Sequence, residues 1–141
     1  MHSFQRFQNK VVIITGASAG VGAETARAFA AQGAKLVLLA RGQQALTDIT
    51  NELKTITDVL NFSLDVCDTE GYKKILEAVE QHFGAIHILV NNAGYHKRGN
   101  VEQNDATELA KMVDVNLSAP IALSALTLPY IQKQQTGAIV N

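Results

Sequence analysis

The 141 residues amount to 15.2 kDa, which suits one modest domain and leaves little room for a second. With 47% hydrophobic and 18% charged residues, the chain has enough apolar material for a folded core, which excludes a disordered or low-complexity segment. Twelve basic and thirteen acidic side chains give a net charge of −1, so we expect neither nucleic acid nor a membrane as a partner.

Two features of the sequence bear on the cellular setting. Cys67 is the only cysteine and has no partner for an intramolecular disulfide, and residues 1–10 contain no apolar run of the kind found in a secretory signal. The longest mostly apolar stretch, residues 120–131, has about twelve residues and is shorter than the ~20 needed to span a bilayer. We therefore expect a soluble protein in the reducing cytoplasm.

The first half of the chain alternates between strand and helix patterns. A run of four β-branched residues at 11–14, stopped by a Thr-Gly pair, predicts a strand buried on both faces. Residues 22–32 are rich in Ala and end before a glycine, which predicts a helix. A second buried strand is predicted at 35–40, and apolar residues at three- and four-residue spacing predict a helix over 45–56.

The alternation continues to the end of the chain. The remaining predicted elements are a strand at 59–65, a helix at 72–83 closed by Gly84, a strand at 86–91, an irregular stretch at 95–104, a long helix over 104–134 and a fifth strand at 137–141. Such alternation indicates a parallel sheet with crossover helices on both faces, which is the doubly wound α/β or Rossmann fold. We expect one domain over residues 1–141.

A glycine-rich turn at residues 15–22 lies between the first predicted strand and helix. Its glycines permit positive φ and a close approach of a ligand to the backbone, and the following helix directs unpaired N–H groups at a pyrophosphate. The spacing is G-x-x-x-G-x-G with no Lys-Ser/Thr pair after it, which excludes the nucleoside-triphosphate loop of kinases and GTPases. A connection without chemical importance is the alternative, but the position between strand and helix favours dinucleotide binding.

Five motifs together resemble a known family. In order and spacing, Thr15–Gly22, Leu64-Asp65-Val66, Asn91-Asn92-Ala93-Gly94, Val115-Asn116 and Gly137–Asn141 are similar to the N-terminal half of the classical short-chain dehydrogenase/reductase family. The resemblance covers essentially the whole chain. With the alternation of elements, it leads us to expect five strands in the order 3-2-1-4-5 and a Rossmann domain that is incomplete after the fifth strand.

The resemblance also implies roles for individual residues. The glycine turn would surround the cofactor phosphates, Asp65 would accept a hydrogen bond from the adenine amino group, and Val66 would lie beside the ring. The turn at residues 91–94 would lie beside the adenosine ribose and the nicotinamide side of the cofactor, although such a turn can also simply cap a strand. Both interpretations can hold at once.

The residue after the second strand bears on cofactor preference. An acidic side chain there accepts from the ribose 2′-hydroxyl of NAD, whereas an Arg pairs with the 2′-phosphate of NADP. Here Ala40 replaces the acid and Arg41 follows, so we expect NADP(H) to be preferred over NAD(H), unless Arg41 is an ordinary solvated charge. The predicted cofactor-binding residues are Gly16, Ser18, Gly20, Val21, Gly22, Arg41, Asp65, Val66, Asn91, Asn92, Ala93 and Gly94.

Most of the family's catalytic groups have no counterpart in these residues. The family uses a Ser just past the fifth strand and a Tyr-x-x-x-Lys pair, whereas Tyr72, Tyr95 and Tyr130 are followed four residues on by Leu, Gly and Gln. Only Asn116 matches a catalytic position, that of an Asn supporting a water and proton relay. We expect the NADP(H)-binding half of a carbonyl/alcohol oxidoreductase, inactive alone on any small carbonyl or alcohol substrate.

Two other functions are weighed beside the oxidoreductase. One is a non-catalytic dinucleotide-binding module such as a redox sensor or pseudoenzyme, and the other is a structural fragment that binds nothing. A cofactor titration separates the second from the rest. An apolar strand edge at the chain's last segment favours a truncated enzyme over both.

The remaining candidate features are weaker. The four histidines, His2, His82, His87 and His96, show no metal-ligand spacing with each other or with Cys67, so we expect no metal site. The segment 96–98 is expected to be a solvated loop. The face of the long helix at 123–131 is either core or the helix-pair dimer surface common in this family, and we expect a homo-oligomer through the long helix 104–134.

Overall fold

The computed structural model describes residues 5–141, so His2 and the first part of the segment considered as a secretory signal lie outside it. The elements in chain order are β1 (Val11–Thr15), α1 (Gly20–Ala31), β2 (Lys35–Ala40), α2 (Gln43–Leu53), β3 (Val59–Ser63), α3 (Thr69–Phe83), β4 (Ile88–Val90), η1 (Val101–Gln103), α4 (Ala106–Val113), η2 (Asp114–Ser118), α5 (Ala119–Gln132) and β5 (Ala138–Val140). The alternation predicted from the sequence is therefore confirmed.

The five strands form one parallel sheet in the predicted order, β3-β2-β1-β4-β5. The central strand β1 is buried along its whole length, as its continuous apolar run predicts. Its Ile13 pairs with Val37 of β2 on one side and with Leu89 of β4 on the other. Thus β4, which is far from β1 in the sequence, becomes its neighbour in the sheet.

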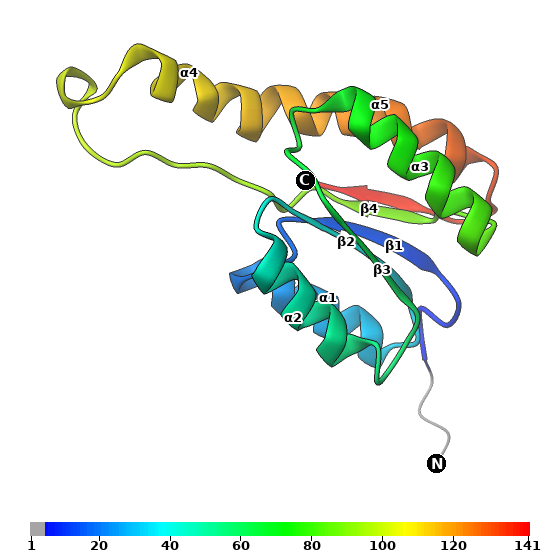
Figure 1. The fold of residues 1–141 in the computed structure, drawn as a ribbon. Helices are drawn as coiled ribbons and strands as arrows, with labels where there is room; N and C mark the ends of the chain where they lie inside the picture. The colour runs from blue at the N-terminus through cyan, green and yellow to red at the C-terminus, as the bar shows by residue number, and fades with distance from the viewer. Residues whose placement is uncertain (1–4) are drawn as a thin grey trace.

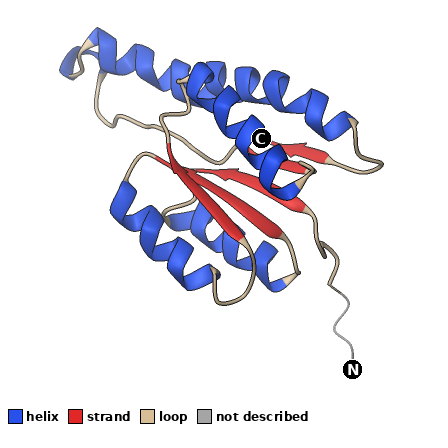
Figure 2. Ribbon diagram, turned by 45° about the vertical axis from the view of Figure 1, so that its right-hand side comes forward, coloured by secondary structure: helices blue, strands red, loops and turns tan. Residues whose placement is uncertain are grey.

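Helices cover both faces of this sheet. Figures 1 and 2 show α1 and α2 on one face, and α3 with the long helix of α4 and α5 on the other. The α1 side is packed by small residues, Ala23, Ala26 and Ala30, which bring the helix close to the strands. Close approach at this helix places its N-terminus immediately beside the end of β1.

The α3 helix begins three residues before the predicted helix. Asp68 caps it, because its carboxylate accepts a hydrogen bond from the Gly71 N–H at 2.9 Å. At the other end Gly84 adopts a positive φ of 77°, which stops the helix where the sequence predicts. The apolar stripe indicates where a helix is buried, whereas the cap decides where it begins.

The predicted long helix is one continuous run made of α4, a π-helical turn (η2) and α5. Its buried residues in α5 include Leu123, Thr127 and Ile131, so the face at 123–131 is core and not a dimer surface. The exposed large apolar side chains of this run lie on other faces, at Val113, Leu117, Ile121 and Leu128. Of the two interpretations that the sequence left open for the face at 123–131, core or dimer surface, the structure supports the core.

The length of this run changes the expectation that no apolar stretch of the chain is long enough to span a bilayer. By length and composition alone, Ala106–Gln132, with 27 residues, is apolar enough to cross a membrane. The twelve-residue stretch visible in the sequence is part of this longer helix, because α4, η2 and α5 continue one another without a break. The residues of α5 that face the core, including Leu123 and Ile131, belong to the same apolar cluster as residues of the sheet.

A buried hydroxyl pair joins α3 to α5. Tyr72 is fully buried, and its hydroxyl lies 2.7 Å from Oγ1 of Thr127, which itself donates to the Leu123 carbonyl at 2.6 Å. Since that Thr127 proton is already used, Tyr72 donates to Thr127. Burial raises the pKa of Tyr72 well above its ordinary value, so the phenol keeps the proton that it donates.

Because Tyr72 is the donor, substitutions of the two hydroxyl residues are expected to lower the free energy of unfolding by unequal amounts. Thr127→Val leaves the buried Tyr72 hydroxyl without an acceptor and is expected to lower the free energy of unfolding by about 1–3 kcal/mol. Tyr72→Phe leaves Thr127 bonded to Leu123 and is expected to lower it by about 0.5–1.5 kcal/mol. Urea denaturation of both variants measures the difference, and a larger loss for Tyr72→Phe would contradict the assigned donor.

Candidate functional site

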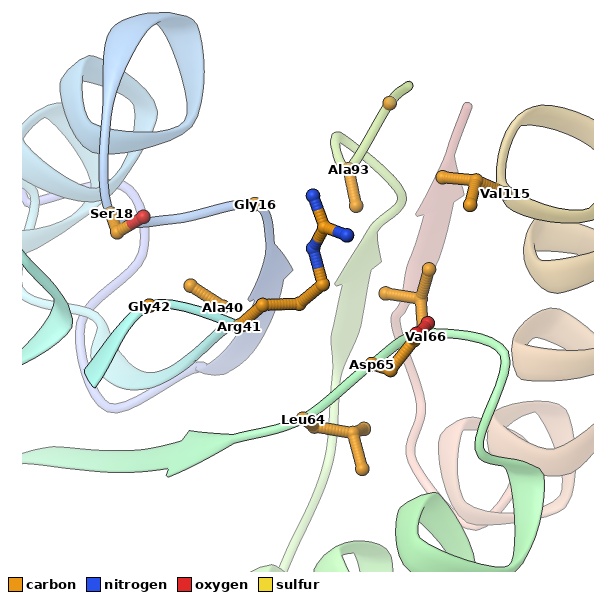
Figure 3. Close-up of a pocket in the computed structure, with 11 residues that line it drawn as sticks. Gly16, Ser18, Ala40, Arg41, Gly42, Leu64, Asp65, Val66, Ala93 and Val115 are labelled. Carbon is orange, nitrogen blue, oxygen red and sulfur yellow. The ribbon is translucent and has the colours of Figure 1, made fainter. Parts of the chain in front are cut away.

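A cavity of about 240 Å³ opens at the carboxyl ends of the strands. It lies where β1 has neighbours on both sides, β2 and β4, which is the switch point at which ligands bind in open α/β sheets. The lining residues, shown in Figure 3, are Gly16, Ser18, Ala40, Arg41, Gly42, Leu64, Asp65, Val66, Ala93, Gly94 and Val115. Segments that are far apart in the sequence therefore meet around one hollow.

The glycine turn lies directly against the turn that follows β4. Gly16 has φ +63°, and a Cβ there would lie 2.9 Å from the Cα of Ala93. A Cβ on Gly22 would lie 2.1 Å from the carbonyl oxygen of Gly16, so α1 could not approach the turn with any larger residue. Contacts within the protein therefore require glycine at these two positions.

The N-terminus of α1 beside this turn has no side-chain cap. Its N-cap residue is Ala19, which makes no side-chain hydrogen bond, and no acidic residue lies in the first turn. The first N–H groups of a helix need an acceptor, and the helix dipole adds positive potential there. This end of α1 is thus suited to an anion such as a phosphate.

The buried hydroxyl of Thr15 holds the two turns together. Its oxygen accepts hydrogen bonds from the backbone N–H groups of Asn92 and Ala93 at 3.0 and 2.9 Å, and its proton goes to the carbonyl of Val90 at 3.4 Å. In return, Nδ2 of Asn92 donates to the carbonyls of Thr15 and Gly16, both at 3.1 Å. The glycine turn and the Asn-Asn-Ala-Gly turn are therefore one hydrogen-bonded unit.

Asn91 contributes on the side away from the cavity. Its Nδ2 donates to Oγ of Ser124 in α5 at 3.1 Å and to Oδ1 of Asn141 at 2.7 Å. These contacts attach the end of β4 to α5 and to the segment after β5. Asn91 therefore supports the site from behind and is not a lining residue.

One cation and one carboxylate belong to the lining. Arg41 extends its side chain into the cavity towards Ala93 in Figure 3, and within residues 5–141 its guanidinium forms no salt bridge. Asp65 follows the neighbouring strand β3, and its Oδ1 accepts from the Cys67 N–H at 3.0 Å. The cavity thus offers a cationic donor and a carboxylate acceptor across apolar walls.

The predicted residues divide into two groups by position. Those that line the cavity are Gly16, Ser18, Arg41, Asp65, Val66, Ala93 and Gly94. The others, Gly20, Val21, Gly22, Asn91, Asn92 and Asn116, are outside the lining. The glycines and Val21 belong to the start of α1, whereas the side chains of the three asparagines form hydrogen bonds with other parts of the protein.

Four lining residues were not among those predicted to bind, namely Ala40, Gly42, Leu64 and Val115. Each is adjacent in the sequence to a predicted residue and lies at or just beyond the end of a strand or within η2. Because parallel strands end at one edge of the sheet, their last apolar residues form the walls between the polar groups. That rule is the signal by which Ala40 and Leu64 could have been found, whereas Gly42 and Val115, the latter in η2, do not follow from it.

Asn116 lies in η2, where its side chain bonds to the backbone of Tyr95 beyond the turn. Its Oδ1 accepts from the Tyr95 N–H at 2.8 Å, and its Nδ2 donates to the Tyr95 carbonyl at 2.7 Å. The segment after the second turn is thereby attached to the long helix. Asn116 sits next to Val115, which lines the cavity.

The described residues, 5–141, contain no cluster of His, Cys, Asp and Glu side chains that could hold a metal ion.

His87 has a structural contact that the sequence did not reveal, since its Nδ1 accepts the Val11 N–H at 3.0 Å. Burial, aided by the charge of Lys10, lowers the pKa of His87 and so favours the neutral ring that this contact requires. Cys67 is exposed as a residue, but partial desolvation of its thiol and the negative charge of Asp65 raise the pKa of Cys67.

Comparison with known proteins identifies the family to which the chain is similar. A model of the family described as short chain dehydrogenase matches residues 10–141. An uncharacterized oxidoreductase from Staphylococcus epidermidis is 36% identical over 136 residues, which are 96% of this chain and 58% of the relative.

Solved structures agree with this similarity. L-Sorbose reductase from Gluconobacter frateurii, complexed with NADPH and L-sorbose, has a TM-score of 0.88 and 30% identity, covering 97% of this chain and 53% of that one. NAD⁺-bound xylitol dehydrogenase has a TM-score of 0.90 and 26% identity, covering 96% and 53%. The chain spans about half the length of these proteins.

The Thr15 hydroxyl provides a direct test of the joined turns. Thr15→Val leaves two backbone N–H groups without their acceptor and is expected to lower the free energy of unfolding by about 1–3 kcal/mol. Thr15→Ser keeps the hydroxyl and is the matched control, with a loss expected to be smaller because only a methyl group is removed. Denaturant titration measures both, and equal losses would mean that packing, and not the hydrogen bonds, joins the turns.

Proposed function

Because the chain belongs to the short-chain dehydrogenase family, we propose that it is the NADP(H)-binding half of an oxidoreductase acting on a small carbonyl or alcohol. The observation that carries the proposal is the cavity at the switch point, where Arg41 reaches in and Ala40 stands in place of an acid. The single exposed thiol of Cys67 suits the cytoplasm as the compartment.

Each part of the proposed cofactor has matching protein groups. The glycine turn and the uncapped N-terminus of α1 would receive the pyrophosphate. Leu64, Asp65 and Val66 would hold the adenine, with Asp65 accepting from its amino group. Ala93 and Gly94 would lie beside the nicotinamide half and direct it towards Asn116.

The chemistry of the complete protein would come from the bound dinucleotide, which supplies or accepts a hydride at nicotinamide C4. The residues of this chain would bind and orient it. Asn116, at the junction of α4 and α5, would support a proton relay of the kind that the family resemblance implies. Its side chain is already bonded to Tyr95, so its position is set within this chain.

The choice between the two cofactors rests on residues 40 and 41. The solved relatives do not decide it, since one was crystallised with NADPH and another with NAD⁺. An acid at position 40 would repel a 2′-phosphate, and none is present; a guanidinium can pair with that phosphate through two N–H groups. Gly42 leaves open space beside Arg41, because a Cβ there would meet nothing within 4 Å.

We also propose that the protein forms a homo-oligomer through the long helix. The exposed large apolar residues Val113, Leu117, Ile121 and Leu128 follow one another at spacings of four, four and seven, which aligns them along the helix. A surface of this kind on a soluble protein is typical of an interaction site. Since the face at 123–131 is core, this stripe replaces it as the proposed contact.

A non-catalytic dinucleotide-binding module is the second candidate. It requires only the glycine turn and the cavity, both of which lie within these 141 residues. Both functions share the proposed cofactor site. They differ in whether catalytic groups act on a substrate beside it.

The 141 residues by themselves are expected not to reduce a ketone with NADPH. General acid–base catalysis contributes about 10²–10⁴-fold, and the groups that perform it in the family have no match here except Asn116. The loss of NADPH absorbance at 340 nm, followed with and without a panel of ketones, tests the expectation. Ketone-dependent oxidation by the purified chain would contradict it, and a complete enzyme of the family serves as the positive control.

Arg41 is the test of the cofactor preference. Arg41→Ala removes a charge-assisted hydrogen bond of about 1.5–3 kcal/mol, so NADPH should bind about ten- to a hundredfold more weakly, with NADH little affected. Exposure of the site favours the lower end of this range. Adding Ala40→Asp should shift preference to NADH, because the carboxylate repels the phosphate and accepts from the free 2′-hydroxyl.

Isothermal titration of each variant with both cofactors measures these ratios. Gln43→Ala, a substitution at the start of α2 outside the cavity lining, is the matched control and should change neither affinity. Equal weakening of NADPH and NADH by Arg41→Ala would remove the basis for the NADP(H) assignment.

A further inference from the structure

The side chain of Tyr95 connects the proposed cofactor site to a helix that the core does not hold. None of the residues of α4 is buried, in contrast to α1, α2, α3 and α5, which each bury four residues against the sheet. Figure 1 shows α4 and the segment before it extending beyond the sheet. Among the residues that the structure describes, core packing therefore contributes little to holding α4.

Three side chains of this region meet around Tyr95. Its hydroxyl donates a hydrogen bond to Oε2 of Glu108, and Nζ of Lys111 lies 5.0 Å from the centre of its ring. Lys97 adds a second contact to the same carboxylate, with Nζ 3.9 Å from Oε2. Both Glu108 and Lys111 belong to α4, so the tyrosine ring is attached to that helix at two points.

The charges in this cluster are consistent with a lasting hydrogen bond. The bond to Tyr95, with the charges of Lys97 and Lys111, lowers the pKa of Glu108. The same bond raises the pKa of Tyr95, and the charge of Arg41 opposes this rise without reversing it. At neutral pH the phenol is therefore a donor and the carboxylate an acceptor. Hydrogen bonds to an ionised acceptor are stronger than those between neutral groups.

The backbone of the same residue is bonded to Asn116. The Asn116 amide exchanges two hydrogen bonds, of 2.8 and 2.7 Å, with the N–H and carbonyl of Tyr95. Tyr95 directly follows Gly94, and Asn116 directly follows Val115, and both of these neighbours line the cavity. One residue thus joins α4, through its side chain, to the cavity wall, through its backbone.

We propose that Tyr95 is a positioning residue for the nicotinamide half of the dinucleotide. By attaching α4 to the segment after Gly94, its side chain keeps Asn116 and the wall formed by Gly94 and Val115 in a single arrangement. The proposal rests on the proposed cofactor site. It adds that the side chain of Tyr95, outside the cavity lining, controls the part of the site formed by Gly94, Val115 and Asn116.

Two probes separate the halves of the site. NADPH carries both halves, whereas adenosine 2′,5′-bisphosphate carries only the adenosine half and its 2′-phosphate. Tyr95→Ala is expected to weaken NADPH about five- to tenfold while leaving the bisphosphate within about twofold, since indirect couplings of this kind are modest. The ratio of the two affinities, measured by titration calorimetry, is the readout.

Graded variants identify the contact responsible. Tyr95→Phe keeps the ring over Lys111 but loses the bond to Glu108, so its loss should be smaller than that of Tyr95→Ala. Glu108→Gln retains an acceptor and should restore most of the affinity that Glu108→Ala removes. Tyr130→Ala is the matched control, because Tyr130 is also partly buried, lies on α5 and packs under a lysine at 4.9 Å, but is remote from both turns.

A second readout follows Asn116 itself. In the wild-type chain its side-chain amide protons should exchange slowly with solvent in ¹⁵N NMR spectra, and Tyr95→Ala should accelerate that exchange while Tyr130→Ala does not. A change in thermal stability alone would not produce this pattern. The measurement is made on the free chain and needs no cofactor.

The outcomes distinguish this proposal from the one on which it rests. If the wild-type chain binds neither probe, the proposed function fails and the positioning role fails with it. If the wild type binds both, and Tyr95→Ala weakens both equally or neither, the cofactor site stands and the role of Tyr95 is overturned. Unchanged exchange of the Asn116 amide in Tyr95→Phe and Tyr95→Ala would overturn it as well.

Discussion

The hydroxyl of Thr15 is the point at which the sheet and the candidate site are joined. It ends the central strand, is almost fully inaccessible to solvent, and accepts from two consecutive N–H groups of the turn after β4. The amide of Asn92 returns two hydrogen bonds to the first turn. Because buried donors without acceptors are costly, each turn is held in the geometry that the other requires.

The strand order makes this contact possible. Only when β4 lies beside β1 do residues about 77 positions apart in the chain come within hydrogen-bonding distance. The same arrangement places the start of α1 beside the two hydrogen-bonded turns. Comparison of α1 with α3 is instructive, since Asp68 caps α3 whereas Ala19 leaves α1 uncapped. The uncapped end is the one that faces the cavity.

The long helix divides at its π-helical turn into parts with different support. Beyond the turn, α5 buries a line of residues against the sheet, and the Tyr72 hydroxyl joins it to α3. Before the turn, α4 buries none and depends on polar contacts with Tyr95. Asn116 lies at this boundary, and π-helical turns are frequently found at functional positions in helices. The support that we propose for the site through Tyr95 is therefore confined to the α4 side of the π-helical turn.

Local patterns in the sequence determined the elements and their arrangement. The apolar run at 11–14 predicted a strand buried on both faces, the alternation predicted a parallel sheet, and Gly84 predicted the end of α3, because each depends on neighbours within a few residues. The motif order further indicated the family and seven of the residues that line the cavity. Whether those residues bind a cofactor, and which one, stays a prediction.

Only the tertiary structure decided the contacts between distant segments. It showed that Leu123 faces the core, that Thr15 bonds to the second turn, and that Arg41 extends into the cavity. It also brought Tyr95 against Glu108 and Asn116, a cluster without a recognisable sequence pattern. Periodicity shows that a helix has an apolar face, but which partner covers that face depends on how the strands and helices pack together in space.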